Sequence, residues 1–188
     1  MSTPEDDLRW LVDDLAYHQT RVLLLVAAVA AEPDHQRKLD GLTKLAKLDF
    51  LVRYPALAPR VLETVDAADE RLHLSAGDRA EPTDVEAPMT RYKYGPWDDR
   101  YYPVIGALVA RGLVRYARGR RGSVALAPTA AGRRLARDLA EDPLWRDVWD
   151  RCAVVAEASG GMTGNALKTQ VYDCLADLMD RPHREVIR

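Results

Sequence analysis

The 188-residue chain has few residues of the kinds that form disulfides, metal sites or membrane spans. It contains two cysteines, Cys152 and Cys174, which are separated by 21 residues and form no C-x-x-C pair. This spacing fits neither a disulfide framework nor a zinc knuckle, so we expect two core thiols. The longest apolar run, Val22 to Ala31, has ten residues, about half of what a membrane-spanning helix needs. The start, Thr3 to Asp7, lacks the pattern of a secretory signal. A cytoplasmic protein without a membrane partner is expected.

Sequence motifs of catalysis are also missing. There is no Walker loop, G-x-S-x-G, H-E-x-x-H or G-x-G-x-x-G, and these are the common signatures of phosphate, nucleophile and metal sites. The four histidines are isolated from one another. The adjacent pair Asp98 and Asp99 resembles a catalytic or metal pair, but carboxylates at a helix start are usually caps. We therefore expect no enzyme, no cofactor, no metal and no small-molecule substrate.

Positive charge is concentrated in the middle of the chain. The segment from Met89 to Arg137 has 11 Lys or Arg against two Asp or Glu, whereas residues 1–88 have 10 against 17 and residues 138–188 have 6 against 10. A basic block between acidic flanks is typical of a surface that binds a polyanion or an acidic protein. A simply solvated face is the alternative, because Arg outnumbers Lys 22 to 5 throughout.

The first half of the sequence predicts helices. Apolar periodicity and capping residues indicate helices from Thr3 to about Tyr17, from His18 to Ala31, from a cap at Asp40 to Tyr54, and from Pro59 to Val65. The second of these is apolar almost all round, so it should lie centrally. The acidic stretch from Asp66 to Pro88 reads as a surface segment.

The second half predicts a hairpin between helices. Met89 to Tyr94 alternates like a strand and Gly95 to Trp97 should form a turn, after which Asp98 or Asp99 caps a helix that Gly112 closes. Leu113–Ala117 and Ser123–Ala127 should form a hairpin whose glycines permit positive φ, and Thr129 should cap a helix to Leu139. Two amphipathic helices follow Asp142.

This order is typical of a winged helix-turn-helix. We therefore expect a mainly α fold with a small β-hairpin wing and additional N- and C-terminal helices. The expected domains are a winged-helix domain at 1–140, with an acidic insertion at about 66–88, and a C-terminal helical extension at 141–188. Fold alone says little about function.

The candidate binding residues divide into two groups. The predicted DNA-binding residues are Arg91, Lys93, Arg115, Arg118, Arg120, Arg121, Arg133, Arg134 and Arg137. The predicted partner-binding residues are Trp145, Trp149, Leu167, Val171 and Tyr172, although both faces of the last helices could instead pack inward. The helix from Tyr101 to Val109 lacks the Asn, Gln and Arg side chains that read bases, so we expect salt-sensitive binding without sequence preference. Tyr92, Tyr94 and Trp97 either stack on bases or support the turn.

Three strings carry a more particular likeness: Leu48 to Pro55, Met89 to Tyr102, and Gly164 to Lys168 together with Tyr172. The chain resembles the small middle components of bacterial ABC-three-component defence systems, the group that includes Lamassu. That resemblance implies a non-enzymatic subunit that bridges an SMC-like ATPase and an effector, often a nuclease, in a complex directed against phage or plasmid DNA. The ATPase and cutting activities would belong to its partners. The composition fits this role, because the basic centre of the chain can face double-stranded DNA.

Two other functions fit the same residues. A free-standing winged-helix transcriptional regulator would bind operator DNA as a dimer, and an antitoxin would cover a toxin. A regulator should prefer one promoter fragment over scrambled DNA, whereas an accessory subunit should co-purify with a large ATPase.

Overall fold

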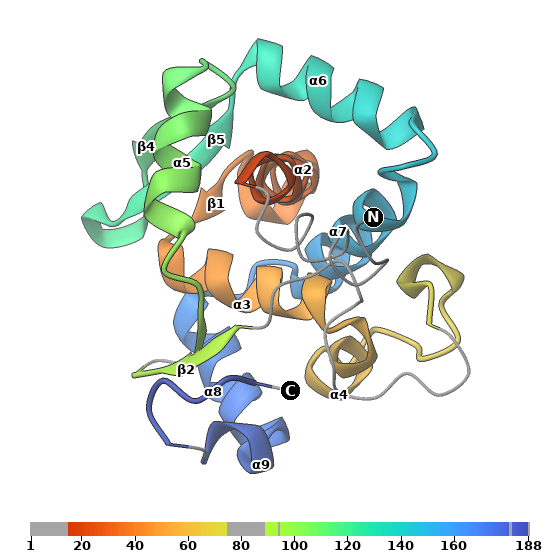
Figure 1. Cartoon of the computed structure of the whole chain (residues 1–188), viewed down its shortest axis with the longest axis vertical. Helices are drawn as coiled ribbons and strands as arrows, with labels where there is room; N and C mark the ends of the chain where they lie inside the picture. Colours follow the sequence, from red (N-terminus) through yellow and green to blue (C-terminus); the bar gives the residue numbers. More distant parts are fainter. Residues whose placement is uncertain (1–14, 75–88, 94, 181, 188) are drawn as a thin grey trace, which may run out of the picture.

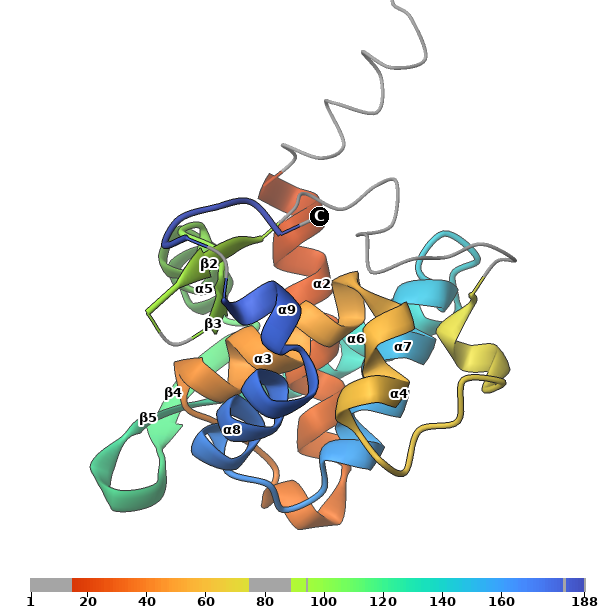
Figure 2. The same ribbon diagram turned by 90° about the horizontal axis from the view of Figure 1, so that it is seen from below.

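The computed structural model describes residues 15–74, 89–93, 95–180 and 182–187 (Figures 1 and 2). It is mostly helical, at 61%, with a small antiparallel sheet. The predicted combination of many helices and a β-hairpin is therefore confirmed. The first predicted helix lies largely outside the described residues, as does much of the acidic stretch before Pro88. No helix in the described ranges is long and apolar enough to cross a membrane.

The α-helices are α2 (Leu15–Ala31), α3 (Leu42–Arg53), α4 (Ala58–Val61), α5 (Tyr101–Ala110), α6 (Ala130–Glu141), α7 (Arg146–Ser159), α8 (Gly164–Cys174) and α9 (Ala176–Met179). The strands are β1 (Leu39–Asp40), β2 (Thr90–Tyr92), β3 (Gly95–Trp97), β4 (Val114–Arg118) and β5 (Val124–Pro128). Short 3-10 turns are η1 (Pro33–His35), η2 (Pro55–Leu57), η3 (Glu70–Leu72) and η4 (Arg120–Gly122).

Helix α2 lies at the centre of the molecule. Figure 1 looks along it and shows α3, α5, α6, α7 and the three-stranded sheet around it. All residues from Val22 to Val29 are buried, as expected for a helix that is apolar on every side. The prediction of a central helix is confirmed, and the surrounding elements pack against α2.

The three-stranded sheet has the order β1-β5-β4, and both pairings are antiparallel. Strands β4 and β5 match the predicted hairpin to within one residue at each end. Strand β1, which pairs Leu39 with Leu126, was not predicted. The prediction that Asp40 caps α3 is wrong, because Gly41 is the N-cap residue and has no side chain. Asp40 instead lies in β1 beside the end of the hairpin.

The boundaries of α5 agree with the sequence at one end only. Gly112 follows the helix with a φ of 67°, and the N–H of Leu113 reaches back to the carbonyl of Leu108, which closes the helix as predicted. At the other end the N-cap is Arg100, without a side-chain cap, so neither predicted aspartate is the cap.

Gly95–Trp97, expected to be a turn, is strand β3. The cap predicted at Thr129 is confirmed, since its hydroxyl accepts from the N–H of Gly132.

A buried network of charges joins α2, α3 and the start of α5. The carboxylate of Asp49 on α3 pairs with Arg21 at 2.7 Å and with Arg53 at 3.1 Å. It also accepts a hydrogen bond of 2.7 Å from the hydroxyl of Tyr101. Arg53 continues the network to Asp98 at 2.6 Å. Burial alone would raise the pKa of Asp49, but the two guanidinium groups lower it, so the carboxylate stays charged.

The C-terminal helices belong to the same core as the rest. Helix α7 packs against α2, and α8 packs against α3. Leu167 and Val171 of α8 are completely buried in this core. The boundary predicted near residue 140 therefore coincides with no break in the hydrophobic core.

We predict that Asp49→Asn destabilises the protein by about 3–5 kcal/mol, because it removes the carboxylate that pairs with the buried Arg21 and leaves Arg53 with Asp98 alone. The measurement is the free energy of unfolding from urea titration. Asp99→Asn is the matched control, since Asp99 is exposed and should change stability by less than about 0.5 kcal/mol. Equal stability of the two variants would contradict the role given to the network.

Candidate functional site

The end of the β4–β5 hairpin exposes several arginines. Arg121 and Gly122 both have positive φ, 52° and 81°, whereas Gly119 has a φ of −88°. The carboxylate of Asp40 holds this turn by accepting from the backbone N–H of Arg120 and from the hydroxyl of Ser123. A Cβ at position 119 would collide with Asp40. Glycine therefore lets β1 hold the hairpin end in place.

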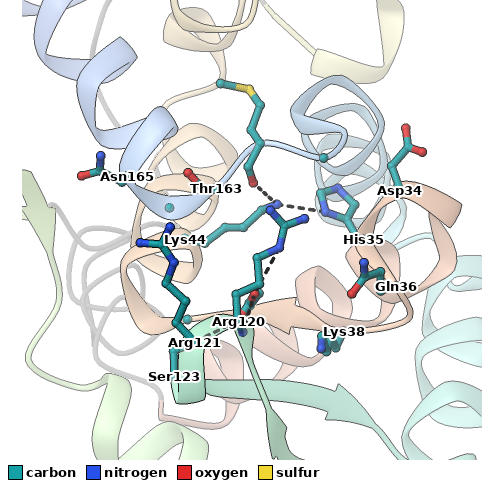
Figure 3. A pocket seen from close by; sticks show the side chains of 15 residues that line it. Asp34, His35, Gln36, Lys38, Lys44, Arg120, Arg121, Ser123, Thr163 and Asn165 are labelled. Carbon is teal, nitrogen blue, oxygen red and sulfur yellow. Dashed lines mark hydrogen bonds and ion pairs between the residues drawn. The ribbon is translucent and has the colours of Figure 1, made fainter.

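A pocket of about 450 Å³ opens beside the hairpin end. Three segments form it: the hairpin end, the turn that links α2 to α3, and the loop that leads into α8 (Figure 3). Its charged or titratable lining residues are Asp34, His35, Lys38, Asp40, Lys44, Arg120 and Arg121. The remaining lining residues are Gln36, Gly41, Ser123, Gly161, Met162, Thr163, Gly164 and Asn165. Segments far apart in sequence thus bring four cationic side chains to one cavity.

Lys44 forms the floor of this pocket. Its side chain comes from α3, and the residue is only 4% exposed. The Nζ atom donates to the carbonyl of Met162 at 2.5 Å and to Nδ1 of His35 at 3.0 Å. Burial, together with the charge of Arg120, lowers the pKa of Lys44 to about 8. The amine is therefore mostly protonated at pH 7.

His35 is neutral in this arrangement. Its Nε2 lies 2.8 Å from the carbonyl of Ala156, which can only accept, so the ring proton is on Nε2. Nδ1 is then free to accept from Lys44. Burial lowers the pKa of His35, and Lys44 acts in the same direction. The imidazole thus orients Lys44 without adding or removing charge.

The pocket has a net positive charge. Lys38, Lys44, Arg120 and Arg121 face only two carboxylates, Asp34 and Asp40. Lys38 is held by the carbonyl of Arg118 at 3.0 Å, a neutral partner. In Figure 3 the side chains of Arg120 and Lys44 extend toward the same space. This arrangement suits the binding of an anion.

The predicted DNA-binding residues fall into three places. Arg115, Arg118, Arg120 and Arg121 are exposed on the hairpin, and Arg133, Arg134 and Arg137 are exposed on α6. Arg91 instead donates to the carbonyl of Met179 and lies 5.7 Å from the ring centre of Tyr172. Strand β2, which is followed by Lys93, lies beside α8 and α9, away from the hairpin and from α6 (Figures 1 and 2). The structure therefore does not unite Arg91 and Lys93 with the other basic residues.

The predicted partner-binding residues are also divided. Trp145 stacks on Tyr17 with ring centres 5.2 Å apart, and Trp149 lines a groove of about 430 Å³ between α2, α6 and α7. The hydroxyl of Tyr172 donates to the carbonyl of Lys93. The prediction is wrong for Leu167 and Val171, because α8 turns this apolar stripe toward α3 and leaves neither side chain exposed.

The aromatic residues near β3 support the fold. Trp97 contacts Tyr101 edge-on at 5.2 Å and Tyr92 at 6.0 Å, which agrees with a supporting role. Tyr94 lies outside the described residues. Cys152 is a buried core thiol as expected, and Cys174 is partly buried.

Sequence reasoning missed the contribution of the turn between α2 and α3. Lys38 and Lys44 lie in a segment whose overall charge is negative, so charge counting by segment hid them. The pair Arg37-Lys38 just before Leu39 was the only local signal. Among the described residues, no group of three His, Cys, Asp or Glu side chains is placed to hold a metal ion.

Comparison with protein families, with curated proteins and with solved structures found no match to this chain.

We predict that two of the five lysines titrate below pH 9. Burial lowers the pKa of Lys44 to about 8, and burial with the charge of Lys168 lowers the pKa of Lys47 to about 7. The folded protein then binds fewer protons than the unfolded chain up to about pH 10, so these groups make stability rise with pH in that interval. The measurement is the pH dependence of lysine 13Cε shifts.

Lys44→Met and Lys47→Met should each remove one of the two titrations, which assigns them. A midpoint for Lys44 near the ordinary value of about 10.4 would show that its amine is not confined as described.

Proposed function

We propose that this chain is a non-enzymatic winged-helix accessory subunit of an SMC-like ATPase defence complex. In this proposal it bridges the ATPase and an effector and contacts the backbone of duplex DNA through the β4–β5 hairpin. The observation that carries the DNA contact is the exposed arginine cluster at the hairpin end, next to a helix with no charged side chain. The membership of the complex rests on the family resemblance of the sequence.

The order and pairing of the elements support the winged-helix part. Helix α2, strand β1, helix α3, helix α5 and the β4–β5 hairpin follow one another, and β1 pairs with β5. A winged helix-turn-helix has this order, with α3 and α5 as its two characteristic helices and the hairpin as its wing. The chain departs from the usual short turn, since residues 54–100 separate α3 from α5.

The outward face of α5 argues against base reading. Tyr101, Val104, Ile105 and Leu108 are buried against the core, which leaves Tyr102, Gly106 and Ala110 exposed on the opposite side. None of the exposed residues can form the bidentate hydrogen bonds that distinguish base pairs in the major groove. A winged helix with such a helix fits an accessory subunit better than a regulator.

The hairpin has the properties of a backbone contact. Arg115, Arg118, Arg120 and Arg121 are exposed, and among the residues that the structure describes Arg120 alone of these four pairs with a carboxylate, 3.7 Å from Asp40. Guanidinium groups bind phosphodiester oxygens without regard to sequence. The rival proposal, a dimeric transcriptional regulator, uses the same hairpin but requires α5 to enter the major groove.

We expect the purified protein to bind promoter and scrambled duplexes with equal affinity, and to bind more weakly as salt rises. Arg115→Glu should weaken binding and reduce the slope of log affinity against log salt by about 0.9, the value for one phosphate contact. Fluorescence anisotropy over a salt series measures both quantities. Arg60→Glu, an exposed charge reversal on α4, is the matched control and should leave the slope unchanged. Preference for one promoter fragment would favour the regulator.

We expect co-expression with an SMC-like ATPase encoded in the neighbouring genes to give one complex of fixed stoichiometry by size-exclusion chromatography with light scattering. Gly106→Arg tests whether the exposed face of α5 contacts the ATPase. A side chain added at this position meets nothing within 4 Å, so the fold has room for it. Ala67→Arg is the control, because Ala67 lies on an exposed turn outside α5. A tight homodimer with no affinity for the ATPase would overturn the proposal.

A further inference from the structure

We propose that the pocket between the hairpin end, the turn from α2 to α3 and the start of α8 binds a phosphate monoester, the group carried by a mononucleotide or by the 5′ end of a nucleic acid strand. This site shares Arg120 and Arg121 with the hairpin surface assigned to duplex DNA, but the rest of its lining comes from other segments, so it does not depend on that assignment.

The first argument is the way in which the cations are held. Lys38 and Lys44 donate to backbone carbonyls, those of Arg118 and Met162. The other partner of Lys44 is the neutral ring of His35. These acceptors orient the ammonium groups without neutralising them. The contrast is with the core, where Arg21 and Arg53 are paired directly with a carboxylate.

The second argument is the convergence of like charges. Arg120 and Lys44 come from elements far apart in the sequence, yet both extend into the pocket (Figure 3). Asp40 is the carboxylate nearest to Arg120, and its oxygens already accept the backbone N–H of Arg120 and the hydroxyl of Ser123. Bringing cations together in a half-enclosed space raises their free energy, and a bound anion removes this cost. An anion with two negative charges should bind more tightly than an anion with one, because it offsets more of this repulsion.

The third argument is the neutral polar lining. The hydroxyl of Thr163 and the amide of Asn165 line the same cavity. A phosphate group offers several acceptor oxygens to such donors, and guanidinium groups match its geometry. Among the described residues that line the pocket there is no Phe, Tyr or Trp, and the ring of His35 is already hydrogen-bonded to Lys44 and Ala156, so the lining offers a base no large stacking surface. The phosphate, rather than the nucleoside, should therefore determine affinity.

The volume agrees with this size of ligand. About 450 Å³ lies within the usual range of small-molecule sites, roughly 300–1,000 Å³. A phosphate with its attached sugar fits in such a space.

Isothermal titration calorimetry with inorganic phosphate, adenosine 5′-monophosphate and adenosine tests the proposal. We expect the first two to bind and adenosine not to bind. A 5′-phosphorylated duplex and its 5′-hydroxyl counterpart then distinguish the sources. Tighter binding of the phosphorylated duplex than of the mononucleotide indicates a strand end, and tighter binding of the mononucleotide indicates a free nucleotide. Equal binding of adenosine and its monophosphate, or equal displacement of phosphate by chloride, overturns the proposal.

Two variants locate the site. Arg121→Gly removes one cation while glycine tolerates the positive φ at this position, and it should weaken phosphate binding about tenfold, as expected for a charged hydrogen bond. Lys44→Met should abolish binding; circular dichroism checks its folding, and Arg121→Gly decides the matter if Lys44→Met does not fold. Arg115→Ala, on the hairpin but outside the pocket lining, is the control and should bind phosphate normally.

The two proposals fail in different ways. If Arg115→Ala and Arg115→Glu lose duplex binding while none of the variants alters phosphate binding, the pocket assignment is wrong and the hairpin assignment remains. If phosphate binds and depends on Arg121 while duplex binding is absent, the reverse holds.

Discussion

The ion pairs of Asp49 are the interaction on which the arrangement of the molecule depends. A single carboxylate, completely buried on α3, contacts Arg21 of α2, Arg53 of α3 and the hydroxyl of Tyr101 on α5. Arg53 extends the set to Asp98 before α5. Hydrophobic contacts between helices tolerate sliding, whereas charged hydrogen bonds in a dry core require one geometry. The network therefore fixes how α5 lies against α2, and α5 in turn leads directly into the hairpin.

At the surface, Asp40 fixes the position of the hairpin end, as Asp49 fixes the position of α5 in the core. It lies in a strand of only two residues, and that strand orders the hairpin end by accepting the N–H of Arg120 and the hydroxyl of Ser123. Without these bonds a four-residue turn with two positive φ angles would have several accessible conformations. The position of the exposed arginines is thus determined by a residue 80 positions away. The same carboxylate forms part of the pocket wall.

Local signals allowed much of the fold to be predicted. The apolar α2, the β4–β5 hairpin, the closing Gly112 and the capping Thr129 all follow from chemistry within a few residues, and each was predicted from the sequence. Strand β1 was not predicted, because two residues become a strand only through their pairing with β5. Asp98 resembled a helix cap for the same reason, since its partner Arg53 is 45 residues earlier.

The candidate site was harder to predict because long-range packing assembles it. The arginines of the hairpin were identified from the sequence, but Lys38 and Lys44 were not, since the charge was summed over residues 1–88, which are acidic as a whole. Amphipathic spacing in α8 correctly indicated an apolar face. It could not tell whether that face meets a partner or the core, and Leu167 and Val171 meet the core.

Buried cations in this protein have two kinds of partner. Arg21 and Arg53 face carboxylates in the core, whereas Lys47 in the core and Lys44 at the pocket donate to carbonyls. Burial lowers the pKa of both lysines and carries a free-energy cost, so this cost alone does not identify a binding site. What sets Lys44 apart is that it lines a cavity together with Lys38, Arg120 and Arg121. The repulsion among these four cations is what an anion bound in the pocket would relieve.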